Sequence, residues 1–207
     1  MNKLSDYGQY KHDLFTKLAF NFERDRSILD VGCGDGSDAE ILSRYFGLRV
    51  SAVDVYKHFR ISSISGIEFS LASMFSLPFE AESFDYVFLH DVLHHVDEGR
   101  QSSELHLAAL VELNRVLRRG GFVVIIESNR FNPISYLHMV KLRGHEHWSQ
   151  SYFRETVRAV YPEAKFRTFE AHAYPWCLWA WKFYETIIEN YLPSSIHSYN
   201  VALSKKP

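Results

Sequence analysis

Short apolar runs alternate with amphipathic stretches along most of the chain. The runs are rich in Val, Ile, Leu and Phe, and the stretches between them repeat an apolar residue every three or four positions. This order is typical of βα units, in which strands pair in parallel and helices cover the sheet. The pattern predicts seven strands, at Ser27–Val31, Arg49–Asp54, Ile67–Leu71, Phe84–Leu89, Gly121–Ile126, Lys165–Ala171 and Tyr199–Ser204.

Helical patterns fill the gaps between the predicted strands. Residues 1–26 form an N-terminal helical segment with its helix at Asp6–Phe22, and a later helix is expected to start near Ser151. A glycine at the end of a periodic run is a helix stop. Two runs have such stops: Ser37–Phe46, which ends at Gly47, and Ser103–Leu117, which ends at Arg118-Arg119-Gly120-Gly121.

The segment 174–193 interrupts this alternation before the last strand. Within it, Trp176–Tyr191 predicts an amphipathic helix whose polar face carries Lys182, Glu185 and Glu189. The helix is too short and too charged to cross a bilayer. Because this connection is not a βαβ crossover, the final strand is free to return antiparallel. We therefore expect an α/β fold with a seven-stranded, mostly parallel, doubly wound sheet and an antiparallel last strand.

Composition narrows the class of protein. The 207 residues suit one domain, 1–207, because this length buries a single core and no linker or repeat divides it. A net charge of -2 without a long basic run offers no grip on a phosphate backbone, so nucleic acid is not an expected partner. Residues 1–10 lack the features of a secretory signal, and Cys33 and Cys177 give no disulfide framework. A cytoplasmic protein without a transmembrane segment is expected.

A glycine-rich loop joins the first predicted strand to the next helix. Gly32, Gly34 and Gly36 are spaced G-x-G-x-G, at the carboxyl end of a strand, where a doubly wound sheet binds its ligand. The NAD-binding loop is spaced G-x-G-x-x-G, and its third glycine would fall at Ser37. Asp30, just before the loop, suits a cationic amino-acid ligand better than a pyrophosphate. These two features favour S-adenosylmethionine over NAD.

Asp54 ends the second predicted strand, about twenty residues beyond the glycine loop. A carboxylate there can accept hydrogen bonds from both ribose hydroxyls of a nucleoside. Such a residue is expected for both NAD and S-adenosylmethionine, so Asp54 supports a nucleoside ligand but does not distinguish between the two cofactors.

In these residues the chain resembles the class I, Rossmann-like S-adenosylmethionine-dependent methyltransferases of the small-molecule group. The resemblance covers about residues 27–127, and its specificity comes from the order and spacing of the motifs. It implies transfer of a methyl group to a small-molecule acceptor, with S-adenosylhomocysteine as the product. The matching segments are Leu29–Gly36, Ala52-Val53-Asp54, Ser76-Leu77-Pro78-Phe79, Ser83-Phe84-Asp85-Tyr86-Val87, Val92-Leu93-His94-His95-Val96 and Leu117-Arg118-Arg119-Gly120-Gly121.

The resemblance also implies cofactor roles by position. Asp30 and the glycine loop would hold the methionine end, Asp54 the ribose, and Val55 the adenine face. Ser73 stands where many relatives carry the Asp that accepts from the adenine amino group, so this contact is expected from Ser73 or from the Met74 backbone. The implied cofactor-binding residues are Asp30, Gly32, Cys33, Gly34, Gly36, Asp54, Val55, Ser73, Met74, His90 and His95.

A cluster of histidines and aspartates follows the fourth predicted strand. Histidines four residues apart on a helix can share a metal ion. The His-His pair, however, resembles one that recurs in the family without a required metal, and no further convergent ligand can be named. No metal site is predicted for the cluster, which comprises His90, Asp91, His94, His95 and Asp97.

The segment after the fifth strand is expected to open on the same edge of the sheet as the glycine loop. Its polar residues either face an acceptor or hydrogen-bond within a loop. His145 and His147 are the candidate general bases, because neutral imidazole takes a proton near pH 7. A base is needed only if the acceptor must lose a proton. The candidate substrate-binding residues are Glu127, Asn129, Arg130 and Trp148.

Aromatic residues are concentrated near the C-terminus. They either pack on the sheet, form a wall or lid of the acceptor pocket, or form a contact in a homodimer. The lid interpretation predicts an apolar or ring-bearing acceptor. The residues concerned are Tyr174, Trp176, Trp179, Trp181, Phe183, Tyr184 and Tyr191.

Two other classes of protein stay open. A non-catalytic S-adenosylmethionine-binding or scaffold protein would share the fold. An NAD-dependent oxidoreductase is disfavoured by the glycine spacing and by the position of its Tyr-x-x-x-Lys pairs. Tyr7 with Lys11 precedes the first strand, and Tyr161 with Lys165 runs into a predicted strand.

Overall fold

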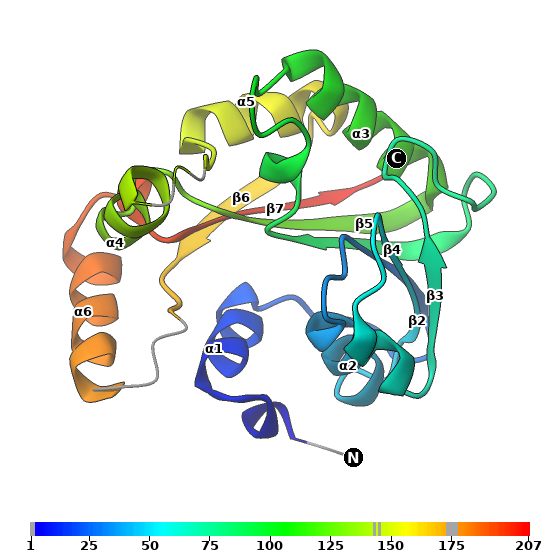
Figure 1. Cartoon of the computed structure of the whole chain (residues 1–207), viewed down its shortest axis with the longest axis horizontal. Helices are drawn as coiled ribbons and strands as arrows, with labels where there is room; N and C mark the ends of the chain where they lie inside the picture. Colours follow the sequence, from blue (N-terminus) through cyan, green and yellow to red (C-terminus); the bar gives the residue numbers. More distant parts are fainter. Residues whose placement is uncertain (1–2, 143, 145, 173–177) are drawn as a thin grey trace.

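The computed structural model describes residues 3–142, 144, 146–172 and 178–207, which form an α/β fold around one sheet (Figure 1). Within these residues the sheet has seven strands in the order β3-β2-β1-β4-β5-β7-β6. β1 to β5 pair in parallel, and β7 runs antiparallel to β5 and β6, which confirms the predicted fold class. The strands are β1 (Ser27–Val31), β2 (Arg49–Asp54), β3 (Ile67–Leu71), β4 (Phe84–His90), β5 (Leu117–Ser128), β6 (Lys165–Phe169) and β7 (Tyr199–Lys205).

Helices cover both faces of the sheet. In Figure 1, α1 and α2 lie below the sheet, α3 and α5 lie above it, and α6 stands at the left. None of the helices in the described ranges is both long enough and apolar enough to cross a membrane. The helices and helical turns are η1 (Leu4–Tyr7), α1 (Gln9–Leu18), α2 (Ser37–Arg44), η2 (Phe59–Ser63), η3 (Leu93–His95), α3 (Ser103–Val116), α4 (Pro133–Ser135), η4 (Tyr136–Leu142), α5 (Gln150–Val160), α6 (Leu178–Tyr191) and η5 (Ser194–Ile196).

Each face of the sheet carries its own apolar layer. Ile28 of β1 belongs to the layer that includes Leu14 of α1 and Ile41 of α2, whereas its neighbour Leu29 belongs to the layer with Leu110 and Phe153. Successive side chains of a strand point to opposite faces, so β1 contributes to both layers. Packing on two sides holds the carboxyl ends of the central strands in fixed positions, where the site lies.

The fifth strand begins earlier than predicted, at Leu117 and not at Gly121. α3 ends at Val116, and β5 already begins at the buried Leu117, which pairs with Phe84. A Cβ on Gly121 would lie 2.6 Å from the carbonyl oxygen of Asp85, and Gly120 has a φ of +75°. The two glycines therefore let β5 pass close to β4 at a shift in the register.

The N-terminal helix is shorter than predicted. The chain turns at Gly8, whose φ of +84° separates η1 from α1. α1 then ends at Leu18, because Ala19 adopts the left-handed conformation with a φ of +46°. This break places the first turn of α1 next to the carboxyl ends of the central strands, where Tyr10 and Lys11 contact His90 at the end of β4.

Candidate active site

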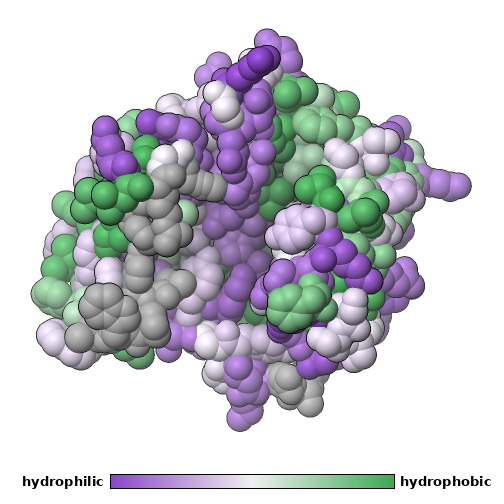
Figure 2. All heavy atoms as spheres, in the orientation of Figure 1, coloured by the Kyte–Doolittle hydropathy of each residue, from purple (hydrophilic) through white to green (hydrophobic). Residues whose placement is uncertain are grey.

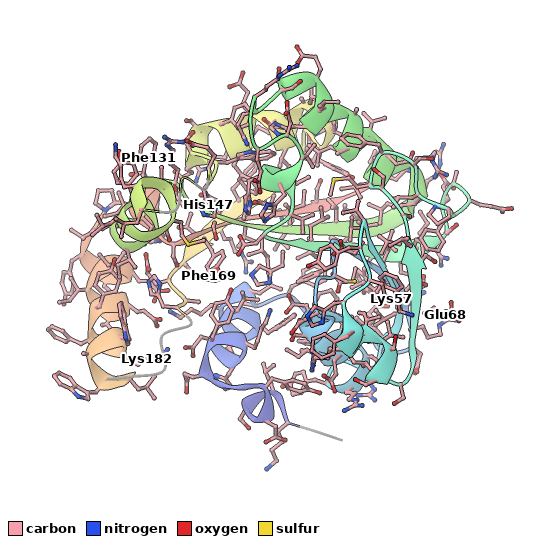
Figure 3. The ribbon with its side chains drawn as sticks, in the orientation of Figure 1. Lys57, Glu68, Phe131, His147, Phe169 and Lys182 are labelled. Atoms are coloured by element: carbon pink, nitrogen blue, oxygen red, sulfur yellow. The ribbon has the colours of Figure 1, made fainter. Side chains whose placement is uncertain are left out.

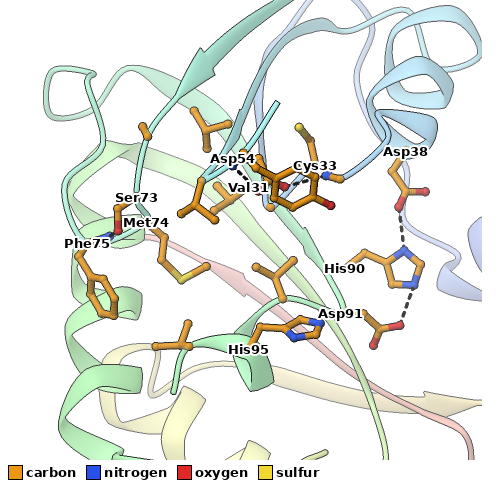
Figure 4. A pocket seen from close by; sticks show the side chains of 18 of the residues that line it. Val31, Cys33, Asp38, Asp54, Ser73, Met74, Phe75, His90, Asp91 and His95 are labelled. Carbon is orange, nitrogen blue, oxygen red and sulfur yellow. Dashed lines mark hydrogen bonds and ion pairs between the residues drawn. The ribbon is translucent and has the colours of Figure 1, made fainter. Parts of the chain in front are cut away.

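A cavity of about 830 Å³ opens beyond the carboxyl ends of β1, β2 and β4 (Figure 4). The strand order reverses between β1 and β4, and this is the place where doubly wound sheets bind ligands. The wall consists of the glycine loop, the end of β2, the segment 72–75 after β3 and the segment 90–97 around the end of β4. Lys11 from α1 and Leu105 from α3 also line it.

Two positions of the glycine loop require the absence of a side chain. Gly32 and Gly34 have φ values of +70° and +52°, which other residues rarely adopt. A Cβ on Gly32 would also lie 2.6 Å from Cγ2 of Val92. The backbone N–H of Gly34 donates to Oδ2 of Asp54 at 2.9 Å. The loop and the end of β2 thus form one cradle, in which backbone can approach a ligand closely.

An ion-paired cluster closes one end of the cavity. Lys11 Nζ donates to Oδ1 of Asp38 at 2.6 Å, and Nδ1 of His90 lies 2.8 Å from Oδ2 of the same carboxylate (Figure 4). Burial tends to raise the pKa of Asp38, but the attraction of Lys11 and His90 outweighs it and holds this pKa well below its ordinary value. Asp38 is therefore ionised, and the cavity offers a cation and an anion side by side.

The opposite end of the cavity is apolar. Val55 and Tyr56 follow β2, and Met74 and Phe75 follow β3, so that two loops supply apolar side chains to the same end. Val55 is largely exposed toward the cavity mouth. The Ser73 hydroxyl accepts from the N–H of Phe75 at 3.3 Å. This end could receive the flat face of an aromatic base.

Two of the eleven predicted cofactor residues do not reach the cavity. Asp30 is buried beneath the start of α2, and burial raises its pKa well above the ordinary range. Gly36 is the N-cap of α2, and its missing side chain makes room for Ile61 and Ile64. The other nine line the wall: Gly32, Cys33, Gly34, Asp54, Val55, Ser73, Met74, His90 and His95.

The sequence prediction missed Lys11 and Asp38, which take the place at the cavity expected of Asp30. Asp38 lies in the first turn of α2, only two residues after the loop, so its position carried a usable signal. Lys11 had none, because α1 reaches the cavity only through the fold.

A hydrogen-bonded network continues from the cavity toward β7. Tyr10 OH lies 3.1 Å from Nε2 of His90 and 2.6 Å from the hydroxyl of Tyr199. Tyr199 in turn donates to Oδ2 of Asp91 at 3.3 Å. Asp91 lines the cavity with a φ of +55°, a strained conformation of the kind found at functional sites. The network fixes α1 against the ends of β4 and β7.

The predicted substrate residues Glu127 and Asn129 lie outside the cavity and are fully buried. Glu127 Oε1 accepts from the backbone N–H groups of Val92 and Leu93 at 2.9 and 2.6 Å, and its Oε2 lies 2.7 Å from Nδ1 of His94. Asn129 donates to two backbone carbonyls of the segment before β7. The expectation that these side chains face an acceptor is therefore wrong, because buried polar groups must be satisfied and both hold neighbouring loops in place.

Arg130 and Trp148 are also absent from the cavity wall. Arg130 pairs with Glu146, and Trp148 is buried, with its Nε1 donating to Gln101 at 2.8 Å. Of the two candidate bases, His147 is buried with its ring centroid 4.6 Å from that of His94. His145 lies outside the described residues.

Among the described residues, one group could hold a metal ion. Ligand atoms of Asp91, His94 and Glu127 lie within 4.8 Å of one another. The carboxylate of Asp91 accepts from the N–H of Ser128 at 2.7 Å, and that of Glu127 accepts from two N–H groups and contacts His94. These hydrogen bonds account for the group without an ion, and the absence of a metal stays a prediction.

A second cavity, of about 340 Å³, lies between α1 and α6. It shares Lys11 with the first cavity. The rings of Tyr7, Tyr10 and Trp181 line it, and Trp181 packs 5.6 Å from the ring of His172. Its charged groups are paired, since Lys182 bonds to Asp13 and to Glu185. The predicted aromatic residues of the C-terminal segment therefore have different positions. Trp181 lines this cavity, whereas Trp179 is 77% exposed and does not. Tyr174 and Trp176 lie outside the described residues.

Comparison with known proteins agrees with this arrangement. The model of a methyltransferase domain family matches residues 29–125. An uncharacterized methyltransferase of Schizosaccharomyces pombe is 30% identical over 152 residues, which are 66% of this chain and 51% of that protein. A demethylmenaquinone methyltransferase of Staphylococcus aureus is 33% identical over 110 residues, covering 49% of this chain and 43% of its own. The chain spans about half the length of the curated relatives it matches.

Solved structures share the fold over nearly the whole chain. Phosphoethanolamine N-methyltransferase 2 of Haemonchus contortus, in complex with S-adenosylhomocysteine, superposes with a TM-score of 0.65 at 18% identity, covering 97% of this chain and 53% of that one. An S-adenosylmethionine-dependent methyltransferase of Archaeoglobus fulgidus gives 0.64 at 17% identity, covering 90% and 88%. Residues 29–125 match a methyltransferase domain family, and the described chain shares its fold with class I methyltransferases. The resemblance found in the motifs is confirmed, and the cofactor of this family is S-adenosylmethionine.

Proposed function

We propose that the chain binds S-adenosylmethionine in the 830 Å³ cavity and transfers its methyl group to a small-molecule acceptor. The observation that carries this proposal is the cradle of Gly32 and Gly34 tied to Asp54, with the Lys11–Asp38 pair beside it. Gly32 and Gly34 line the cavity without side chains, which lets a ligand approach the backbone, and a paired cation and anion fit an amino acid.

Each part of the cavity has a partner in this cofactor. Asp54 would accept from the ribose hydroxyls, and Val55 and Met74 would flank the adenine. At the other end, Lys11 would bind the carboxylate of the methionine group and Asp38 its ammonium. These exchanges replace one charge-assisted hydrogen bond with another, so that neither side chain is left unpaired.

The charge of the cavity supports this cofactor over NAD. Five carboxylates line the wall, Asp35, Asp38, Asp54, Asp91 and Asp97, against a single lysine, Lys11. Such a wall attracts a sulfonium cation and repels a diphosphate. The Tyr-x-x-x-Lys pairs support the same choice. Tyr161 is the buried C-cap of α5 while Lys165 lies in β6, and Tyr7 and Lys11 lie in separate helical elements.

Transfer requires little chemistry from the protein. S-adenosylmethionine supplies an activated methyl group when bound, and the side chains have to hold the acceptor atom in line with it and exclude water. Asp91 and the Tyr10–Tyr199 pair would border the place of the acceptor atom, on the side away from the glycine loop. His145 and His147 stay proposed bases for an acceptor that must lose a proton.

The proposed acceptor is apolar or ring-bearing and occupies the second cavity. The rings of Tyr7, Tyr10 and Trp181 line that cavity, and Lys11 lines both it and the cofactor site. Of the described residues that line the cavity, Lys11 and Lys182 are both paired with carboxylates, which disfavours a strongly anionic acceptor. The relatives named demethylmenaquinone methyltransferases support a ring-bearing acceptor by that name.

Titration calorimetry with S-adenosylhomocysteine and with NAD tests the cofactor. We expect binding of the first and none of the second. Asp54→Ala should weaken S-adenosylhomocysteine binding by about 1–3 kcal/mol, the cost of leaving buried polar partners unsatisfied. Glu68→Ala, which removes an exposed carboxylate on β3, is the matched control and should leave affinity unchanged. Equal affinity of Asp54→Ala and the parent protein would contradict the assignment of Asp54.

A non-catalytic binding protein is the second candidate. It would bind S-adenosylhomocysteine in the same way but would consume no S-adenosylmethionine with any ring-bearing acceptor. Formation of S-adenosylhomocysteine in the presence of an acceptor therefore separates the two.

A further inference from the structure

α6 turns its charged side toward the protein. Lys182 projects toward α1 and bonds to Asp13 (Figure 3). Glu189 accepts from Lys17 at 2.7 Å, and Glu185, which is buried, lies 3.6 Å from the same ammonium. Lys182, Glu185 and Glu189 are all the charged residues of this helix, and they contact α1, one another and the backbone of Glu170.

The outward side of α6 is uncharged and largely apolar. Leu178, Trp179, Phe183 and Tyr191 are 46%, 77%, 65% and 80% exposed. The exposed polar residues on the same side of the helix are Thr186 and Asn190, which both donate to backbone carbonyls of their own helix. We call these six residues the α6 stripe. A surface helix normally keeps its charges in solvent, whereas α6 holds its charged side chains, together with the buried Ile188, on the inward side.

A second exposed apolar group lies on η4. Leu137 and Leu142 are 61% and 73% exposed, and Lys141 between them is exposed as well. Asn132, the N-cap of α4 that leads into η4, donates to the carbonyl of Ile196 shortly after α6 ends, which keeps the two elements adjacent. Figure 2 shows hydrophobic residues gathered on the left, where Figure 1 places α4 and α6. Large apolar patches on a protein surface mark binding sites.

The chemistry of the patch fits a lipid surface. Trp and Tyr are the side chains enriched where bilayers meet water, and Trp179 and Tyr191 stand near the two ends of the stripe. No charge on the stripe would have to leave water. Lys141 can extend past its apolar neighbours to the headgroups. A stable protein–protein interface draws on roughly 20–30 residues on each side, several times the number in the stripe.

We propose that the α6 stripe and η4 rest on a membrane surface, from which an apolar acceptor passes into the second cavity. Leu178 is exposed and also lines that cavity, and Trp181, Lys182 and Glu185 form the cavity wall on the next turn of the same helix. The part of the proposal that concerns the acceptor rests on the proposed function. With a net charge of -2, attachment depends on apolar insertion and not on attraction to anionic lipids.

Flotation with phosphatidylcholine vesicles tests the docking surface without cofactor or acceptor. We expect the parent protein to float with the vesicles, at low salt and at about 1 M salt alike, because apolar insertion is not screened. The double variant Trp179→Ser, Phe183→Ser should lose about tenfold or more in partitioning, since two large apolar side chains no longer insert. Phe183→Glu alone should reduce it in the same direction. Val111→Ser with Phe59→Ser is the matched control, because both side chains are exposed but lie on α3 and η2.

Three results would overturn the docking proposal. They are no flotation of the parent protein, equal loss in the control pair, or a dimer in sedimentation that the Trp179→Ser, Phe183→Ser variant abolishes. Titration with S-adenosylhomocysteine on the same variants gives the separate readout of the proposed function. Affinity that stays normal while flotation is lost supports the docking surface, whereas a parent protein that floats but does not bind S-adenosylhomocysteine contradicts the cofactor proposal alone.

Discussion

Residues 27–128, which build most of the cofactor cavity, and residues 129–198, which contribute to the second cavity, assemble their sites over very different distances along the chain. In the first region a ligand-facing residue lies at the end of a strand or in the loop after it, and Gly34 meets Asp54 twenty residues away. In the second, Lys182 meets Asp13 across 169 positions. The proposed cofactor site is built from residues close together in the sequence, whereas the proposed acceptor site is built from elements that meet only after folding.

The strongest test of the first region compares two glycines of the same loop. Gly32→Ala should lower the free energy of unfolding by about 2–4 kcal/mol. The added Cβ collides with Val92, and the alanine must adopt a left-handed backbone conformation. Gly34→Ala meets no atom within 4 Å and should lower it by about 1 kcal/mol through the conformation alone. Urea denaturation measures both. Similar losses for the two variants would mean that close packing does not shape the loop.

The second region is tested by replacing, one at a time, two tryptophans that the sequence analysis placed in the same group. Trp181→Ala should lower kcat/KM by about ten- to a hundredfold for an acceptor that the parent protein methylates, because it removes a wall of the second cavity. S-adenosylhomocysteine affinity should stay near normal. Trp179→Ala should leave turnover of a water-soluble acceptor unchanged, since this side chain faces solvent. Equal effects of the two substitutions would place the acceptor elsewhere.

The smallest effect expected concerns His94, which lies where the two regions meet. Burial lowers its pKa, but the attraction and hydrogen bond of Glu127 outweigh it, and the pKa lies above its ordinary value. The folded protein therefore binds this proton more tightly than the unfolded chain. The resulting stabilisation is complete below about pH 6.5, the ordinary value for histidine, and is lost as the pH rises through the folded pKa.

Urea denaturation between pH 6 and pH 8, repeated in Glu127→Gln, measures this contribution. The glutamine keeps an oxygen for the N–H groups of Val92 and Leu93 but no longer attracts a proton on His94. The free energy of unfolding should fall less with pH in the variant than in the parent protein. An identical pH dependence would show that His94 does not titrate against Glu127.

Features that depend on residues close together in the sequence were predicted better than features that depend on the whole fold. The bounds of β1, β2 and β3 agree with the predicted strands. The runs that form β1 and β2 are short, largely apolar and mostly buried, whereas β3 is an edge strand in which apolar and polar residues alternate. Asp30 failed as a cavity residue because side chains alternate along a strand, and an acidic residue before the loop points beneath it. Glu127 failed for a different reason. A polar residue after a strand can either face a ligand or satisfy neighbouring backbone, and only the fold shows that Val92 and Leu93 needed an acceptor there.

The register of β5 and β7 has a practical consequence for protein engineering. Ser128 at the end of β5 pairs directly with Tyr199 at the start of β7. The intervening stretch, 129–198, includes the edge strand β6, and its two ends lie at neighbouring positions of the sheet, about 5 Å apart, the usual spacing of paired strands. Transplanting that stretch between related chains would require two junctions at a single point of the sheet, so the α6 wall of the second cavity could be exchanged while α1, the glycine loop and Asp54 stay untouched.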